Sequence, residues 1–222
     1  MDGNRRWGRQ NKGDSLEGHK EGSITLKKIL EHCYDIGVKV LTVYALSTEN
    51  LKRSKEELAC HFGLHKKYLK EWILDSNEMV KKKIKFRVMG RKELLPKDEQ
   101  KMIEQAEKKT ENFSDFIFNV CLCYDGQDEI VDAVKKIVDK KIKSSEITRE
   151  SIKQHLYTKD IPSPELMIKT GMNPEKRVSS FLLWDIAYSE LFFVPTLWPD
   201  FSSKELDKII EEFNNRERRF GR

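Results

Sequence analysis

Three short polar segments of this sequence combine residue types that can hold a phosphate-like anion. The first opens the chain as MDGNRRW, residues 1–7. Asn4 can cap a helix whose free N–H groups bind an anion, and Gly3 lets that anion approach the backbone closely. Asp2 beside a diphosphate would be repulsive unless Mg²⁺ bridged the two, since Mg²⁺ takes one or two carboxylates together with phosphate oxygens. We therefore predict that Asp2 is a magnesium ligand.

The distribution of arginine supports anion binding at the chain ends. Of the 42 basic residues, 30 are lysine and 12 are arginine. Seven arginines lie near the termini: Arg5, Arg6, Arg9, Arg216, Arg218, Arg219 and Arg222. Guanidinium is the better bidentate partner for phosphate oxygens. Two plainer explanations stay open, namely solubilising termini and an ordinary capped first helix, although cations in a first turn oppose the helix dipole.

The second segment is STENLKR, residues 47–53, directly after an apolar run, with Glu57 one turn further on. A hydroxyl, an amide and a guanidinium converge there. The plain alternative, in which Ser47 and Asn50 only cap the next helix, leaves Arg53 unexplained.

The third segment runs from Lys169 to Ser179 and includes Lys176 and Arg177. These cations and the serine can reach one anion, although loop cations are commonly just solvated.

Alternating apolar patterns indicate the elements that position these segments. Period-two or continuous apolar runs predict strands at residues 38–46, 84–88, 116–124, 166–169 and 191–194. Helical periodicity predicts helices at residues 20–36, 56–82, 96–110, 127–141, 149–156, 180–188 and 204–218. Strands that alternate with helices predict a parallel α/β sheet in a single domain over residues 1–222. Ligands of such sheets bind beyond the carboxyl ends of the strands, where the second and third segments lie.

Composition excludes several other classes of protein. The chain has 222 residues, 38% hydrophobic residues and a net charge of +5, which argues against global disorder and against a polycationic tail. The cysteines lack the short spacings of a zinc site and fit a reducing compartment: Cys33, Cys60, Cys121 and Cys123. No run approaches the roughly 20 apolar residues of a membrane helix. We expect a cytoplasmic protein, with peripheral membrane contact left open.

Six motifs resemble those of the cis-prenyltransferases, a family that includes undecaprenyl and dehydrodolichyl diphosphate synthases. In chain order they are MDGNRRW, GHKEG, YALSTENLKRSKEE, RVSSFLLWDIAYSEL, LWPDF and RERRFG. The resemblance implies a homodimer-forming α/β domain with a mostly parallel sheet of about six strands and a hydrophobic tunnel. It also implies Mg²⁺-dependent condensation of isopentenyl diphosphate onto an allylic diphosphate such as farnesyl diphosphate, with cis double bonds, which gives a long-chain polyprenyl diphosphate for a glycan-carrier lipid.

The resemblance also implies roles for individual residues. Asp2 would hold Mg²⁺, with Glu190 as a second metal carboxylate. Asn50, Ser47 and His19 would join Asp2 in catalysis. The residues implied to bind substrate are Gly3, Asn4, Arg5, Arg6, Trp7, His19, Ser47, Arg53, Glu57, Lys169, Arg177, Ser179, Arg219 and Gly221. Arg219-Phe220-Gly221 would reach into the partner's site, and Leu58, Phe62, Leu69, Trp72 and Ile73 would partly line the tunnel.

The chain departs from the family pattern at a few places. Ser15 and Lys169 stand where the family has arginine, and Leu51 stands where tryptophan is usual. The loop between Lys169 and Arg177 is about two residues longer than usual, and residues 120–127 differ from the family's Asn-Tyr-Gly-Gly-Arg pattern. The family's strand before MDGN is also missing, so we expect that Met1 is an internal methionine or a trimmed start.

These departures leave a second hypothesis open, a non-catalytic subunit that forms a heterodimer with an active homologue. Retention of Asp2 argues against it. A nucleic-acid binder would show a recognised binding motif or a clustered basic stripe, and the sequence has neither. A trans-type prenyl synthase would show aspartate-rich metal motifs, and no Asp-Asp pair occurs.

Overall fold

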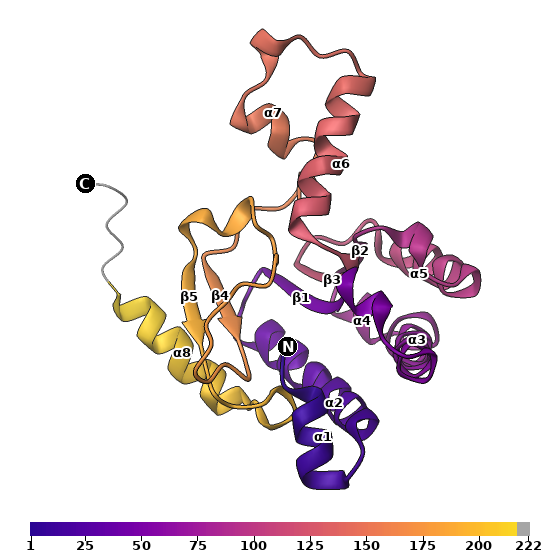
Figure 1. Ribbon diagram of the computed structural model, residues 1–222, viewed down its shortest axis with the longest axis vertical. Coiled ribbons are helices and arrows are strands. Elements are labelled where there is room, and N and C mark those ends of the chain that lie inside the picture. Colours follow the sequence, from indigo (N-terminus) through magenta and orange to yellow (C-terminus); the bar gives the residue numbers. More distant parts are fainter. Residues whose placement is uncertain (217–222) are drawn as a thin grey trace. The chain divides into compact units, whose positions relative to one another are not determined.

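The computed structural model describes residues 1–216 and divides into two compact units (Figure 1). The first unit comprises Met1–His32, Pro164–Arg177 and, among the described residues, 188–216. The second comprises Cys33–Ser163 and Val178–Ala187. Helix α2 (Ser15–Asp35) begins in the first unit and ends in the second.

The second unit is built on a parallel three-stranded sheet in the order β1-β3-β2. Its strands are β1 (Val40–Ser47), β2 (Ile84–Met89) and β3 (Phe116–Tyr124). The central strand β3 is buried along most of its length, which explains why its sequence is almost continuously apolar rather than alternating. Register pairs Val40 with Ile117 and Ser47 with Tyr124, so the carboxyl ends of β1 and β3 lie together.

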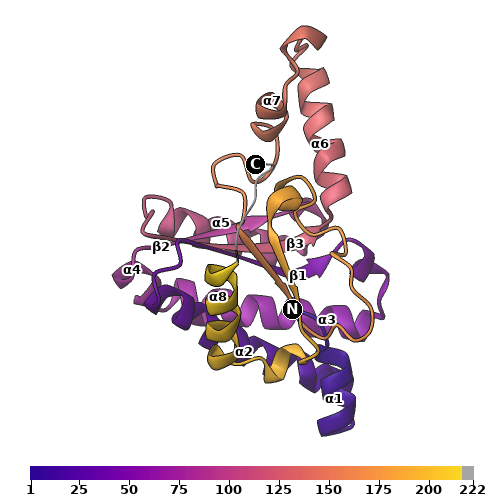
Figure 2. The same ribbon diagram turned by 90° about the vertical axis from the view of Figure 1, so that its left-hand side faces the viewer.

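Helices accompany these strands in the order that the apolar periodicity predicts. They are α3 (Lys55–Tyr68), α4 (Glu78–Lys81), α5 (Lys97–Thr110), α6 (Gly126–Asp139) and α7 (Arg149–Lys153). Helices α6 and α7 lie side by side and extend away from the sheet (Figure 2).

The single long helix predicted over residues 56–82 is wrong. Helix α3 passes into one π-helical segment, η2 (Leu69–Leu74), and then ends. The ammonium of Lys109 on α5 donates to the carbonyls of Ile73, Leu74 and Ser76 at 2.8, 2.8 and 2.9 Å. These bonds satisfy carbonyls that a helix end leaves unpaired, and so they stabilise the break. Leu69 and Ile73 are buried in the core.

The first unit contains α1 (Asn4–Lys12), most of α2, a parallel strand pair and α8 (Ser203–Asn215). The strands are β4 (Leu166–Lys169) and β5 (Glu190–Phe193), and Leu166 pairs with Glu190 while Lys169 pairs with Phe193. The loop after β5 packs on α2, because the Trp198 indole N–H donates to the Gly22 carbonyl at 2.7 Å.

The parallel α/β class is confirmed, and the five predicted strands are present. They form one three-stranded and one two-stranded sheet, so the expected sheet of about six strands is not found among residues 1–216. The predicted helix over residues 180–188 is also wrong. That segment consists of turns and a short 3₁₀ helix, η5 (Asp185–Tyr188), because Ser180 and Leu182 have φ of 62° and 46°.

Two features bear on the protein's surroundings. Within residues 1–216, no helix combines the length and the apolar character needed to cross a membrane. The four cysteines are thiols, and burial raises the pKa of Cys33 to about 11 and that of Cys123 to about 12.

Candidate functional site

In the first unit, the backbone of Asp2 is held between the ends of two structural elements. Its N–H donates to the hydroxyl of Thr170, directly after β4, at 2.9 Å. Its carbonyl accepts from the Trp198 N–H, also at 2.9 Å. The half-buried Asp2 carboxylate is oriented in turn by the Gly3 N–H, which donates to Oδ1 at 2.8 Å. Contacts from distant parts of the chain therefore fix this carboxylate.

Helix α1 begins immediately after this carboxylate. Gly3, not Asn4, is the N-cap residue, with φ of 101°. The amide of Asn4 instead packs inward, and a Cβ at Gly22 would lie 2.1 Å from its Oδ1. The first intrahelical bond is donated by Trp7 to the Gly3 carbonyl, and the N–H groups of a helix's first turn point towards its positive end, where an anion can bind. No acidic residue lies in the first turn of α1 itself, and the carboxylate of Asp2 lies directly before it, at the positive end of the helix dipole.

Two cations lie beside this helix start. The guanidinium of Arg6 donates to the Gly171 carbonyl, and a Cβ at Gly171 would lie 2.6 Å from Arg6 Nη2. Lys169 at the end of β4 is only 8% exposed. Burial lowers the pKa of Lys169, the charge of Asp2 opposes this shift, and the charge of Arg177 adds to it. Lys169, Asp2 and Arg177 thus form one electrostatic neighbourhood.

Three other residues of the first unit that the resemblance implies bind substrate have different surroundings. Trp7 is buried, and its indole N–H donates to Asp200 Oδ1 at 2.6 Å. Arg5 is exposed. His19 is half-buried on α2, where its carbonyl accepts from the Ser23 hydroxyl at 2.9 Å.

Glu190 lies at the opposite end of the strand pair from Lys169. It is the first residue of β5, in register with Leu166, whereas Lys169 is the last residue of β4. Three strand residues correspond to about 10 Å. The Glu190 carboxylate accepts from Arg216 Nη1 at 2.8 Å. One chain therefore does not bring Glu190 to the carboxylate of Asp2.

In the second unit, the Ser47–Asn50 turn follows the carboxyl end of β1. The Asn50 N–H donates to Ser47 Oγ at 3.1 Å, and the Ser47 N–H donates to Asn50 Oδ1 at 3.4 Å. The Thr48 N–H donates to the Tyr124 carbonyl at 3.1 Å, which attaches the turn to the end of β3. The two predicted catalytic side chains therefore lie together at the carboxyl edge of the sheet.

A charged cluster continues from this turn into α3. Arg53 Nη1 donates to Glu57 Oε1 at 2.9 Å and lies 3.1 Å from His61 Nε2. Glu57 and His61 are buried, at 7% and 6% exposed. His61 was not among the predicted site residues, although residues 53, 57 and 61 share the four-residue spacing of one helix face.

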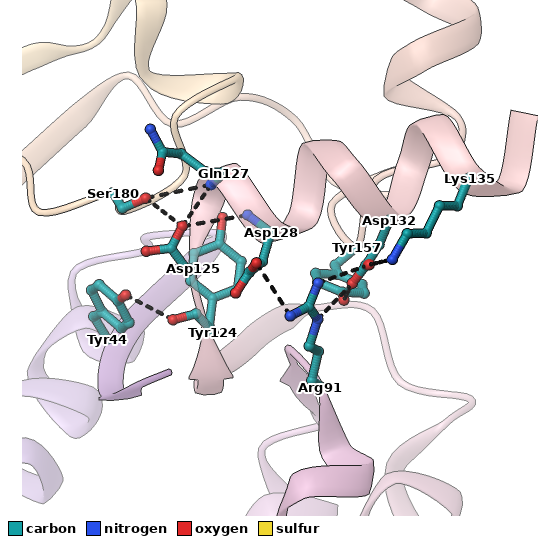
Figure 3. Close-up of polar contacts among 10 residues, drawn as sticks. All are labelled: Tyr44, Arg91, Tyr124, Asp125, Gln127, Asp128, Asp132, Lys135, Tyr157 and Ser180. Carbon is teal, nitrogen blue, oxygen red and sulfur yellow. Dashed lines mark hydrogen bonds and ion pairs between the residues drawn. The ribbon is translucent and has the colours of Figure 1, made fainter. Parts of the chain in front are cut away.

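Ser179 is exposed in the turn that precedes η5. This turn is held near the end of β3, because the Ser180 hydroxyl donates to Asp125 at 2.7 Å (Figure 3). Thr170 and Asp125 were not among the predicted site residues, although their side chains hydrogen-bond Asp2 and Ser180. Thr170 had one weak signal, a polar residue directly after a strand. Arg219 and Gly221 lie outside the described residues.

Known proteins resemble this chain along its whole length. A family model described as "Putative undecaprenyl diphosphate synthase" matches residues 1–221. A tritrans,polycis-undecaprenyl-diphosphate synthase (geranylgeranyl-diphosphate specific) of Pyrococcus horikoshii is 45% identical over 226 residues, 100% of this chain and 84% of that protein. An isoprenyl transferase of Fusobacterium nucleatum is 47% identical over 221 residues, 100% of this chain and 93% of that protein.

A solved structure is similar along the whole chain. It is lavandulyl diphosphate synthase from Lavandula x intermedia in complex with dimethylallyl diphosphate. Its TM-score is 0.93 at 32% sequence identity, and the match covers 100% of this chain and 95% of the other.

Proposed function

The chain belongs to the undecaprenyl diphosphate synthase family of cis-prenyltransferases and is therefore a prenyl-transferring enzyme, and we propose that it condenses isopentenyl diphosphate repeatedly onto an allylic diphosphate. The product would be a long-chain polyprenyl diphosphate for a glycan-carrier lipid. Farnesyl diphosphate is our proposed starter. Geranylgeranyl diphosphate is the alternative to compare, because several similar proteins are named as specific for it. We place the enzyme in the cytoplasm, with peripheral membrane contact through its lipid product.

One observation carries the proposal: Asp2, the start of α1, Arg6 and Lys169 lie in one neighbourhood of the first unit. Backbone N–H groups, a guanidinium and an ammonium suit the oxygens of a diphosphate. The carboxylate of Asp2 lies in the same neighbourhood as these cations. It would repel a diphosphate bound there unless a cation bridged the two.

The donor set at Asp2 fits magnesium. Mg²⁺ commonly takes one or two protein carboxylates and completes its shell with phosphate oxygens and water. The Gly3 N–H occupies Oδ1 and thereby orients the carboxylate. When bound, the ion would stabilise negative charge on the departing diphosphate. Arg6 and the first-turn N–H groups of α1 would hold the same diphosphate in place.

The second unit would supply the groups for the condensation. Ser47 and Asn50 lie at the carboxyl edge of the sheet, where we propose that they act at the reacting carbons or in the loss of the proton. We propose that Ser179, with Arg177, binds the diphosphate of isopentenyl diphosphate. Arg53 and Glu57, ion-paired at 2.9 Å, would complete the substrate-binding set.

We further propose that the enzyme acts as a homodimer. Glu190 lies at the far end of the strand pair from Asp2, so a role of both carboxylates on one ion requires Glu190 from a second copy of the chain. The same proposal includes Arg219 and Gly221, which would reach into the partner's site. A heterodimer with a homologue is the alternative.

The decisive assay is incubation with Mg²⁺, labelled isopentenyl diphosphate and either farnesyl or geranylgeranyl diphosphate. The native chain should form extended prenyl products, and Asp2→Ala should reduce kcat by at least about 100-fold because the leaving diphosphate loses its metal. Asp139→Ala removes an exposed carboxylate at the end of α6 and serves as the matched control. A well-folded native chain that makes no product would favour the non-catalytic subunit instead.

A further inference from the structure

The turn at residues 178–182 has unfavourable backbone torsion angles, which need contacts with neighbouring residues to hold them. Ser179, Ser180 and Leu182 have φ of 50°, 62° and 46°, in the left-handed region that residues with a Cβ rarely adopt. Three such residues within four positions keep this conformation where neighbouring contacts impose it. The contacts that impose it therefore determine where Ser179 lies.

The first of these contacts is with Asp125 (Figure 3). The Ser180 hydroxyl donates to Asp125 Oδ1 at 2.7 Å. The same oxygen accepts from the backbone N–H of Gln127 at 2.8 Å and, more weakly, from that of Asp128 at 3.4 Å. Asp125 thus caps α6 and holds the turn through a single carboxylate oxygen.

Gly126 supplies the second contact. Its N–H donates to the Ser180 carbonyl at 2.8 Å, and a Cβ at Gly126 would lie 2.5 Å from that oxygen. Only glycine permits this approach. The first N–H groups of α6 are consequently bound to Ser180 and Asp125, so a phosphate at the turn must be bound by other groups.

The third contact ties the turn to the sheet. The Phe181 ring stacks on Tyr44 of β1, with centroids 5.2 Å apart and planes 17° apart. The Tyr44 hydroxyl donates to the Tyr124 carbonyl at 2.8 Å, at the end of β3 (Figure 3). Burial raises the pKa of Tyr44 far above its usual value, so the phenol keeps this donated proton. The turn is therefore fixed to the two strand ends that also carry Ser47.

Helix α6 is itself anchored. Arg91, which follows β2, pairs with Asp128 at 3.2 Å and with Asp132 at 3.0 Å (Figure 3). The hydrogen bond from Arg91 lowers the pKa of Asp132, so this pair stays charged. Asp125 therefore caps a helix that Arg91 ties to the end of β2.

We propose that Asp125 is a positioning residue for the binding of isopentenyl diphosphate. Its carboxylate holds Ser180, and this contact places the neighbouring Ser179 against the diphosphate. The inference rests on the proposed function, in which Ser179 binds that group. Acceptor geometry, rather than negative charge, is what the turn requires of residue 125, because the contacting atom accepts bonds from N–H and O–H donors only. Asp125→Asn therefore preserves the interaction, since Asn also caps helices well.

The test separates placement of the turn from stability of the helix. Asp125→Ala removes both the α6 cap and the bond to Ser180, whereas Ser180→Ala leaves the Asp125 cap in place. Thr148→Ala removes an equivalent side-chain cap from α7 and is the matched control. For each variant we would measure kcat, KM for both substrates, the melting temperature, and the Kd for isopentenyl diphosphate by calorimetry.

We expect Asp125→Ala and Ser180→Ala each to raise KM and Kd for isopentenyl diphosphate about fivefold to tenfold, the size of one lost hydrogen bond. KM for the allylic substrate should stay constant. Asp125→Asn should remain within about twofold of the native value, and Thr148→Ala should change only the melting temperature. The double variant should bind no more weakly than either single variant, because both changes break one interaction.

Two results would overturn the proposal: Asp125→Ala and Ser180→Ala leaving the Kd unchanged, or the two effects adding fully in the double variant. Failure of the proposed function would look different. In that case the native chain would form no prenyl product, while the calorimetric comparison of the variants would still decide the role of Asp125.

Discussion

The hydroxyl of Thr170 should lower the Mg²⁺ concentration that activates the enzyme, although it contacts no reacting atom. Thr170 is 2% exposed, and its Oγ1 accepts from the Asp2 N–H at 2.9 Å. Thr170→Val replaces the hydroxyl by a methyl group of similar volume. The Asp2 N–H would then lose its acceptor in a part-buried setting, and the segment that carries the metal carboxylate would lose one of its two anchors.

Thr170→Val removes two hydrogen bonds, because the Thr170 hydroxyl also donates to the Asp2 carbonyl at 3.0 Å. The larger cost comes from the Asp2 N–H, since the Asp2 carbonyl keeps its bond from the Trp198 N–H. A buried donor without a partner costs about 1 to 3 kcal/mol. For a chain of this length, such a loss lowers the melting temperature by roughly 2 to 4 °C per kcal/mol. If the cost also falls on the orientation of Asp2, half-maximal activation should require about tenfold more Mg²⁺, since 1.4 kcal/mol is a factor of ten.

Thr110→Val is the matched control. Thr110 is fully buried, and its Oγ1 accepts from the Phe86 N–H at 3.0 Å, so the same kind of bond is lost within the second unit. Both variants should show similar thermal destabilisation by calorimetry. Only Thr170→Val should change the Mg²⁺ activation curve and KM for the allylic diphosphate. If the two variants behaved alike in every assay, the reasoning that places Asp2 at the metal would be refuted.

Three further predictions concern Lys169, Glu190 and Lys109. Burial lowers the pKa of Lys169, so the unfolded chain binds this proton more tightly than the native chain does. The free energy of unfolding should therefore rise as the pH approaches the ordinary lysine pKa of 10.5. In urea unfolding measured at several pH values, Lys169→Met should make this rise smaller. The same substitution should raise KM for the diphosphates. If Glu190 binds the metal of a second copy, Asp2→Ala and Glu190→Ala chains that are mixed equally and reassociated should recover about a quarter of native activity. Half of the dimers are then mixed, and each mixed dimer has one of its two sites intact. No recovery would mean that Glu190 does not bind the partner's metal. Lys109→Met should lower the free energy of chemical unfolding by about 1 to 3 kcal/mol, because three carbonyls at and after the end of η2 lose their donor. Unchanged stability would mean that water replaces the ammonium there.

Local patterns predicted most of the elements correctly because they depend on neighbouring residues. The strand predictions at residues 116–124 and 166–169 coincide with β3 and β4. Errors arose where a distant side chain overrides the local preference. The apolar periodicity of residues 56–82 continues without a break, yet Lys109 from α5 stabilises the end of the helix near Leu74. The apolar periodicity of residues 180–188 predicts a helix, yet contacts of Ser180 with Asp125 and Gly126 hold the start of this segment in turns.

The sequence by itself determined the family, the parallel α/β class and the residue types available for a diphosphate site, because motifs and periodicity are properties of the chain in order. Tertiary structure alone decided that Thr170 and Trp198 anchor Asp2, that Glu190 and Lys169 lie at opposite ends of a strand pair, and that Asp125 holds Ser180. Strand register and hydrogen bonds between residues up to 196 positions apart set these relations, and no local pattern encodes such distances.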